Sequence, residues 1–452
     1  MTEFFYRAKG DLFYGLLLLI SSVLAFLLRK FASVDSRRWL EGFIGVGLTL
    51  FIAGNMLFCS LLIVVSHLIM FRLIKNPRIL TSLSFYGTFA FLAFLRLMHF
   101  VGLPRLEFVT NAIQLILTLR LIGLSFEIAD FRLSKKSDNR VLVIEREPST
   151  FEAFNYLYNF TGLFTGPYFT YRTYSDSLTM WKRPLLWNKL NPLIVGKIMT
   201  LSWSLPSLIF LTWLDPVNVL RKEHVITAWW LFHDFIWCAI AFLYLRMRIY
   251  SAWMVAESIC LLTGIGVYPK EWESTPGNGP TNMQKIVEID WNDQSIEFDS
   301  ETINNLDIPN VEHSDGFRSG IRAWNRTVQF WLANCVYRRS ARSIRMPYTM
   351  LVSAFWHGIH PGYFLSFLTI PLCTTVEDKL FQAFPIDNRP RLLQLFWSFI
   401  RMRGFEFMAS GFLLLDGWET LRLWKRMRVF LVVFYYVFYT RINLAFQKEI
   451  YL

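Results

Sequence analysis

The sequence carries little charge for its length, and long apolar runs take its place. Only 18% of the 452 residues are charged, against about 25% in soluble domains, while 54% are hydrophobic. A bilayer core about 30 Å thick needs around 20 apolar residues for one helical crossing. Runs of this kind lie near residues 12–28, 40–54, 56–74, 79–101, 108–128, 193–214, 225–245, 249–267, 347–373, 392–415 and 427–446. We therefore expect an all-α polytopic membrane protein with about ten or eleven transmembrane helices.

Paired cysteines and internal repeats are also missing. The five cysteines are scattered, and none belongs to a Cys-x-x-Cys pair, so neither a zinc site nor a disulfide framework is indicated. No repeat of fixed period is present, and the two halves lack matched interrupted helices. Their absence argues against an inverted-repeat transporter.

The net charge of +12 does not indicate nucleic-acid binding, because the charges are laid out for a membrane. Residues 268–319 hold eleven acidic and three basic residues, so the excess of Lys and Arg lies elsewhere. Pairs such as Arg29-Lys30, Arg37-Arg38 and Lys135-Lys136 stand beside apolar runs. Such pairs are typical of membrane-flanking loops that face anionic headgroups.

Three segments do not have the pattern of simple membrane spans. Residues 151–176 mix aromatic residues with Asn, Thr, Gly and Pro, which favours a re-entrant or interfacial segment. Residues 268–312 are the longest polar stretch, and we expect an acidic, exposed loop there. Residues 318–345 alternate Arg with Trp, Phe and Leu, which predicts an amphipathic helix along a surface or cavity.

Ionisable residues inside apolar stretches indicate that the bundle has a polar interior. Each costs roughly 2.5–3.5 kcal/mol near the centre of a membrane helix, so such groups usually face a cavity or a partner. Structural pairing is the more frequent reason for keeping them, and chemistry is the alternative. They are His67, Arg120, Glu127, His233, Asp234, Glu257, His357 and Glu406.

His357 stands apart because a helix interruption follows it. Pro361 disfavours helical geometry at His360, and Gly362 loosens the chain further. Non-helical backbone at membrane depth is tolerated where it lines a cavity or is enclosed by protein. A neutral imidazole there can serve as a general base, and a hydrogen-bonded core histidine is an equal alternative. Because no third ligand accompanies His357 and His360, we predict no metal.

The second candidate is Asn325, in the amphipathic segment. In a continuous helix Asn325 and Gln329 share a face, beside an apolar stripe that includes Trp324. An amide there can hold a substrate hydroxyl or carbonyl, or fix the ring of a histidine. Asn325 and Asn159 also fit the Asn-x-Thr glycosylation pattern, but their aromatic surroundings argue against that use.

A cluster of arginines follows this segment. Clustered guanidinium groups bind phosphates, so the cluster is a candidate docking patch for the nucleotide end of CoA or for anionic lipid headgroups. Its members are Arg338, Arg339, Arg342 and Arg345.

The sequences of several segments resemble those of the membrane-bound O-acyltransferases, and within that family the branch that acts on lysophospholipids such as lysophosphatidylinositol. The similar segments read NAIQLILTL at 111–119, TGPYFTYRTY at 165–174, WNRTVQ at 324–329, SAFWHGIHPGY at 353–363 and LSFLTIPLC at 365–373. In that family a His and an upstream Asn share an intramembrane chamber. The resemblance assigns these catalytic roles to His357 and Asn325 and makes residues 1–452 one domain.

The resemblance also implies the substrates. Acyl-CoA is the expected co-substrate, an arachidonoyl-like chain the expected acyl group, and lysophosphatidylinositol the expected acceptor, in the endoplasmic reticulum membrane. No cofactor and no nucleic acid are expected. Candidate substrate contacts are Trp324, Gln329, Trp356 and His360, together with the arginine cluster. The alternatives are another lysophospholipid, a neutral lipid or a protein as acceptor, and a transporter without acyl transfer.

Overall fold

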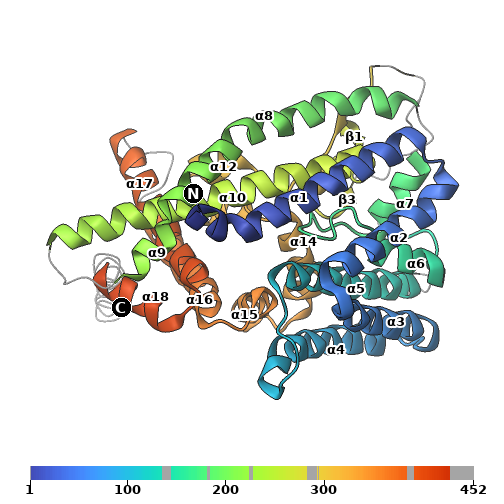
Figure 1. Ribbon diagram of the computed structural model, residues 1–452, viewed down its shortest axis with the longest axis horizontal. Coiled ribbons are helices and arrows are strands. Elements are labelled where there is room, and N and C mark those ends of the chain that lie inside the picture. Colours follow the sequence, from blue (N-terminus) through green and yellow to red (C-terminus); the bar gives the residue numbers. More distant parts are fainter. Residues whose placement is uncertain are drawn as a thin grey trace, which may run out of the picture. The chain divides into compact units, whose positions relative to one another are not determined.

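The computed structural model describes residues 2–134, 144–180, 184–222, 228–281, 293, 295–383 and 391–427. These residues are mostly helical (Figure 1). The chain divides into two compact units, which interleave along the sequence. Unit 1 comprises residues 1–206, 249–306 and 325–340, and unit 2 comprises residues 207–248, 307–324 and 341–452. The single domain over residues 1–452 stays a prediction.

Unit 1 begins with long helices, joined by short turns. They are α1 (Thr2–Phe31), α2 (Val34–Ala53), α3 (Leu57–Leu73), α4 (Pro77–Leu97) and α5 (Phe108–Ser134). Two short helices follow, α6 (Thr150–Leu157) and α7 (Tyr171–Met180). The unit also contains α14 (Arg326–Cys335), the first part of α8 (Pro184–Leu214) and the last part of α10 (Ala228–Leu262).

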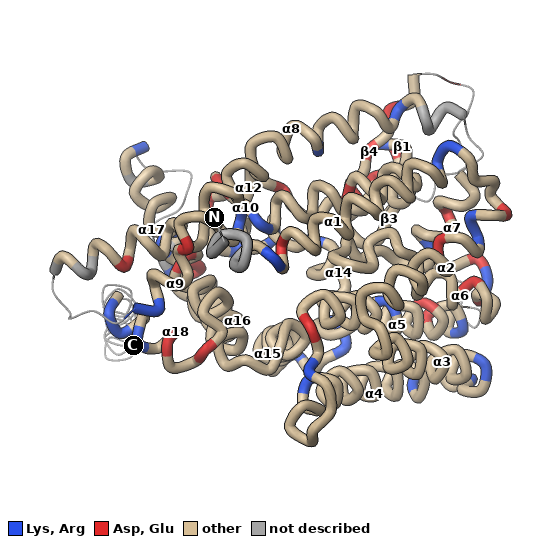
Figure 2. Tube along the Cα trace, in the orientation of Figure 1, with Lys and Arg blue, Asp and Glu red and all other residues tan. Residues whose placement is uncertain are grey.

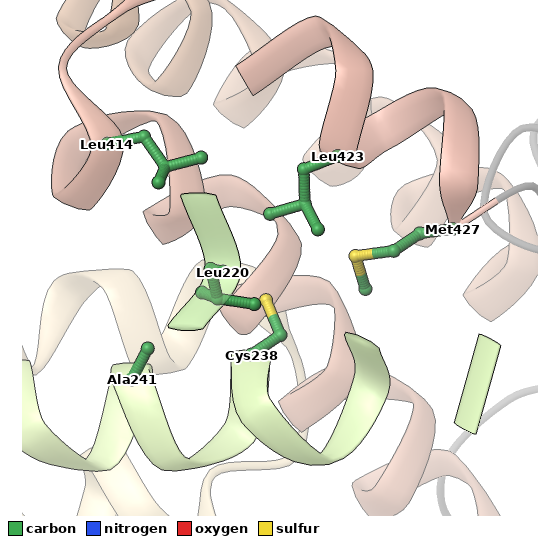
Figure 3. Packing of buried hydrophobic residues seen from close by; sticks show 6 residues of the cluster. All are labelled: Leu220, Cys238, Ala241, Leu414, Leu423 and Met427. Carbon is green, nitrogen blue, oxygen red and sulfur yellow. The ribbon is translucent and has the colours of Figure 1, made fainter. Parts of the chain in front are cut away.

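Unit 2 holds the remaining helices. They are α9 (Pro216–Arg221), α12 (Ile308–His313), α13 (Phe317–Arg322), α15 (Arg345–His357), α16 (Pro361–Ala383), α17 (Arg391–Leu414) and α18 (Gly417–Arg426). Helix α16 packs on α15, α17 and α18. A small apolar core joins α9, α10, α17 and α18 (Figure 3). Its buried members are Leu220, Cys238, Ala241, Leu414, Leu423 and Met427.

Six helical segments in the described part of the chain are long and apolar enough to cross a membrane. They are Ala8–Phe31, Val34–Leu73, Pro77–Val101, Phe108–Ser134, Asn188–Arg221 and Phe232–Leu262. The middle of α1 and of α4 carries no charge (Figure 2). A polytopic membrane protein is thereby confirmed, whereas the number of ten or eleven spans stays a prediction.

Some predicted spans are joined or divided in the structure. The runs near 40–54 and 56–74 form one 40-residue segment, with a short 3-10 turn at Gly54–Met56. Most of the runs near 225–245 and 249–267 lies in the single helix α10. The run near 347–373 is broken between α15 and α16, and the run near 427–446 lies outside the described residues except for its first position.

The polar segment 268–312 is more folded than we expected. Two short antiparallel pairs form here: β1 (Tyr268–Pro269) with β4 (Phe298–Asp299), and β2 (Ser274–Thr275) with β3 (Gly279–Pro280). Tyr268 and Trp272 are buried. The expectation of an exposed loop is wrong for residues 268–281, because its aromatic and glycine residues pack into unit 1. These strands are also a small departure from an all-α fold.

Local capping explains where several of the helices begin. Asn76 accepts a hydrogen bond from the backbone of Arg78 at the start of α4, and Pro77 fills the first helical position. Ser149 and Glu152 form a reciprocal capping box at α6. Arg146 donates a hydrogen bond to the Glu152 carboxylate. This bond, together with the capping bonds from Ser149, lowers the pKa of Glu152 to about 2. The Glu152 carboxylate is therefore ionised at neutral pH and keeps its hydrogen bonds at the start of α6.

Candidate functional site

His357 is the last residue of α15, and the predicted interruption follows it. Gly358 is extended, with φ 175° and ψ 179°, and its amide donates to the carbonyl of Ala354. Helix α16 begins at Pro361. His357 is half-buried, whereas His360 is exposed. The chain thus places the His357 side chain at a helix end, as the Pro and Gly signals predicted.

Aromatic rings surround the His357 imidazole within unit 2. The ring of Phe367, from α16, stacks on it with a centroid distance of 5.1 Å and an interplanar angle of 22°. The ring of Phe412, from α17, meets it edge to face at 5.1 Å and 81°. Trp356 and Tyr363 lie at 4.6 Å and 5.9 Å. The ring is therefore held by side chains from three helices.

Asn325 does not lie within a helix, which corrects our expectation. Residues 318–345 form separate pieces: α13, α14, and a 3-10 turn at Tyr337–Arg339. Asn325 is the N-cap of α14 and has left-handed backbone angles, φ 50° and ψ 48°. Its carbonyl accepts the amide of Gln329 at 3.0 Å, so the two residues still bracket the first turn. Trp324 precedes this turn and is half-buried.

A hydrogen-bond network in unit 1 fixes the Asn325 turn. Asn305 accepts the backbone amide of Arg326 at 3.0 Å and the hydroxyl of Thr327 at 2.5 Å. The backbone amide of Asn305 donates in turn to Glu257 at 2.9 Å. Glu257 also pairs with Lys197 at 2.5 Å. Glu257 was among the predicted buried charges, whereas Asn305 and Thr327 carried no sequence signal.

Burial argues against glycosylation at both Asn-x-Thr matches. Thr327 is fully buried and bonded on two sides, since it also accepts the amide of Tyr168 at 3.1 Å. Asn159 is fully buried and donates to Glu41 at 2.8 Å. A transferase needs the acceptor motif at an exposed surface.

The aromatic segment 151–176 is folded around Arg120. Between α6 and α7 the chain is non-helical and almost entirely buried. The guanidinium group of Arg120, itself fully buried on α5, donates at 2.6–3.2 Å to four carbonyls, two at the end of α6 and two in this non-helical stretch. It also lies over the Phe169 ring at 4.8 Å. The acceptors are Tyr156, Leu157, Asn159 and Thr161. Backbone that leaves helical geometry inside a membrane protein needs such substitute partners.

Two carboxylates support the same stretch. Glu127, on α5, accepts the first amides of α7, those of Tyr171 and Arg172, at 2.8 and 3.1 Å. Glu41, on α2, pairs with Arg37 at 2.6 Å, and both side chains are fully buried. The interpretation of Arg37 as a membrane-flanking residue is therefore wrong, because Arg37 is buried in an ion pair with Glu41, one turn later on the same helix.

Other ionisable residues of the apolar stretches form hydrogen bonds or ion pairs with neighbouring side chains. His67 bonds Ser84 and Thr88 at 3.0 and 3.1 Å, which links α3 to α4. In unit 2, Asp234 pairs with Arg426 at 2.7 Å and lies 3.6 Å from His233. Glu406 pairs with Arg403. These contacts support the structural interpretation over the catalytic one.

The arginine cluster is divided between the units. In unit 1, Arg338 and Arg339 are exposed; Arg339 pairs with Asp130 at 3.1 Å and covers the Phe126 ring at 4.3 Å. In unit 2, Arg342 is exposed, and Arg345 is the half-buried first residue of α15. Arg339 thus has an acidic partner within the chain, which reduces its availability for a phosphate.

Comparison with known proteins identifies clear relatives. The sequence model of the membrane-bound O-acyltransferase family matches residues 109–415. A membrane-bound acylglycerophosphatidylinositol O-acyltransferase of Caenorhabditis elegans is 37% identical over 442 residues, covering 96% of this chain and 95% of that protein. A protein of the same description from Homo sapiens is 36% identical over 433 residues, covering 91% and 89%. Each alignment covers so much of this chain that His357 and Asn325 lie within it.

Proposed function

The chain belongs to the membrane-bound O-acyltransferase family, and from this premise we propose that it acylates the free sn-2 hydroxyl of lysophosphatidylinositol with acyl-CoA as donor. The chain is thus a membrane-bound acyltransferase, and the acceptor and donor are the proposal. The observation that carries the chemistry is His357 at the interrupted end of α15, enclosed by aromatic rings. The names of the relatives support the inositol headgroup.

The proposed reaction needs one base and one polar anchor. His357 accepts the proton of the sn-2 hydroxyl as the oxygen attacks the thioester carbonyl. The carbon–sulfur bond then breaks, and CoA leaves as a thiol that takes the proton back from His357. Asn325 donates to the developing oxyanion or holds the hydroxyl. No covalent acyl-enzyme is required, and a chamber closed to water limits hydrolysis of the thioester.

The remaining assignments complete the proposal. The acyl group is a polyunsaturated chain such as arachidonoyl, and the membrane is that of the endoplasmic reticulum. Candidate substrate contacts are Trp324, Gln329, Trp356 and His360. Arg338, Arg342 and Arg345 are candidate partners of the CoA phosphates, since guanidinium groups bind phosphate oxygens in pairs.

The first test is a competition among acceptors in isolated membranes. Arachidonoyl-CoA is offered with equal amounts of lysophosphatidyl-inositol, -choline, -ethanolamine and -serine, and products are identified by mass. We expect phosphatidylinositol to dominate in the wild type and to be absent in His357→Ala. Dominance of another phospholipid would leave the family intact and overturn the proposed headgroup. Absence of every product, with well-expressed protein, would direct the search to neutral lipids and then to transport.

The left-handed backbone at Asn325 allows its amide to be tested separately from its turn. Asn325→Gly removes the amide and keeps a backbone that favours a positive φ, whereas Asn325→Ala also strains the turn. We expect Asn325→Gly to retain a small residual rate, about 10²–10³-fold below wild type, with normal accumulation. The measurement is kcat per folded molecule. A glycine variant with wild-type kcat would show that Asn325 serves the turn alone.

A further inference from the structure

The rings of Phe367 and Phe412 hold His357 from two directions. Phe367 is nearly parallel to the imidazole, and Phe412 is nearly perpendicular to it, each at a centroid distance of 5.1 Å. The two phenylalanines contact each other as well, at 6.5 Å. They come from two different helices, α16 and α17, which follow the helix interruption after His357 and pack against each other. We call Phe367 and Phe412 the aromatic clamp.

We propose that the aromatic clamp positions the His357 imidazole for proton transfer, so that Phe367 and Phe412 act on the rate through His357. The proposal rests on the proposed role of His357 as the base. It assigns no contact with substrate to either phenylalanine.

The position of His357 explains why a clamp is needed. The preceding turn of α15 disfavours one of the three χ1 rotamers of His357, and the χ2 torsion of a histidine is broad, so the backbone alone does not fix the imidazole. A stacked ring and a perpendicular ring together restrict rotation about both side-chain torsions. Each aromatic pair of this kind is enough to change a rotamer population by about two- to tenfold.

Phenylalanine is also chemically suited to the task. The lone pair of a neutral imidazole lies in the plane of its ring, and a ring stacked on the face does not occupy it. A phenyl ring has no hydrogen-bond donor, so it does not itself bind the basic nitrogen.

The backbone brings the two phenylalanines to the same ring. The amide of Gly362 donates to the carbonyl of Leu415 at 2.8 Å, which ties the start of α16 to the end of α17. A Cβ atom on Gly411 would lie 2.7 Å from the Gly362 carbonyl, and one on Gly362 would clash with the Gly411 carbonyl. Backbone contact at this point requires glycine on both helices. Phe412 directly follows Gly411, and Phe367 lies five residues after Gly362, between one and two turns along α16.

Simple core packing is the alternative, and kinetics distinguish it from positioning. A packing residue affects how much protein folds, whereas a positioning residue affects the turnover of each folded molecule. Phe367→Leu and Phe412→Leu keep an apolar side chain and remove the flat ring. Phe367→Tyr and Phe412→Tyr keep the ring. Phe396→Leu is the matched control, because Phe396 is 60% exposed on α17.

The experiment measures kcat and KM for both substrates, per folded molecule, in these variants and in His357→Ala. We expect kcat to fall about tenfold in each Leu variant, with KM changed by less than about threefold, and to return toward wild type in the Tyr variants. Phe396→Leu should match wild type. If a Leu variant does not accumulate, Phe367→Met and Phe412→Met replace it, since methionine fills irregular apolar gaps.

The outcomes separate the two claims. Wild-type kcat in the folded Leu or Met variants, with His357→Ala inactive, would overturn the clamp and leave the proposed function standing. A kcat loss shared equally by the Tyr variants would also overturn it, because the ring would not be the feature that matters. Full activity of His357→Ala would refute the proposed function itself.

Discussion

His357→Ala is expected to abolish acyl transfer while the protein still inserts and accumulates. A general base contributes about 10²–10⁴ in rate, and alanine offers neither a proton acceptor nor an acid for the departing thiol. The same change removes little of the fold, since His357 is half-buried at a helix end and its neighbours are rings of other residues. The rate is measured as product formed from labelled acyl-CoA per folded molecule.

A second histidine in unit 2 provides the control. His313 is exposed at the end of α12, so His313→Ala makes the same chemical change away from the aromatic rings. We expect it to match wild type. A stable His357→Ala protein with the activity of His313→Ala would end the assignment of His357 as the base, whatever the family resemblance implies.

Local signals in the sequence were sufficient for one half of the candidate site. The interruption after His357 depends on Pro361 and Gly362, whose backbone preferences act within a few residues. That prediction is confirmed. The aromatic clamp was not predicted, because Phe412 is 55 positions from His357 in the sequence and reaches it only through the contact of α16 with α17.

The other half depended on contacts that periodicity does not show. The alternation of residues 318–345 continues through Asn325, which favoured one helix, yet the turn there is held by Asn305, twenty residues earlier. Arg37 was misassigned for a similar reason, since its partner Glu41 lies inside the apolar run. In both cases a specific polar partner outweighed the general pattern of the segment.

The buried arginines show how far the sequence could lead. Arg120 was predicted to face a partner, and the structure supplies four main-chain carbonyls from residues 156–161. In unit 2, Arg401 plays a similar part, donating to the carbonyls of Val311 and Glu312 and to the hydroxyl of Ser314. Because carbonyls belong to every residue, no residue type in the sequence marks the acceptors. The need for a partner was predictable, and its identity was not.

Arg120→Lys is expected to lower the stability of the protein by several kcal/mol, although it keeps the charge. A guanidinium group spreads five donors over a planar fork, whereas an ammonium group has three donors at one point. Lysine therefore cannot donate at once to the carbonyls at the end of α6 and to those in the stretch that follows it. Each buried acceptor left without a donor costs about 1–3 kcal/mol, so the loss of two amounts to about 2–6 kcal/mol.

Thermal unfolding in detergent measures this loss, with Arg78→Lys as the matched control, because Arg78 is exposed in the first turn of α4. We expect Arg120→Lys to unfold at a clearly lower temperature and to accumulate poorly, and Arg78→Lys to match wild type. Arg120→Leu separates the effect of the charge from that of the hydrogen bonds. It removes the buried charge but leaves all four carbonyls without a donor, so we expect it to be at least as unstable as Arg120→Lys. Wild-type unfolding of Arg120→Lys would show that the four carbonyl contacts do not hold the aromatic segment, since a single point charge would then suffice.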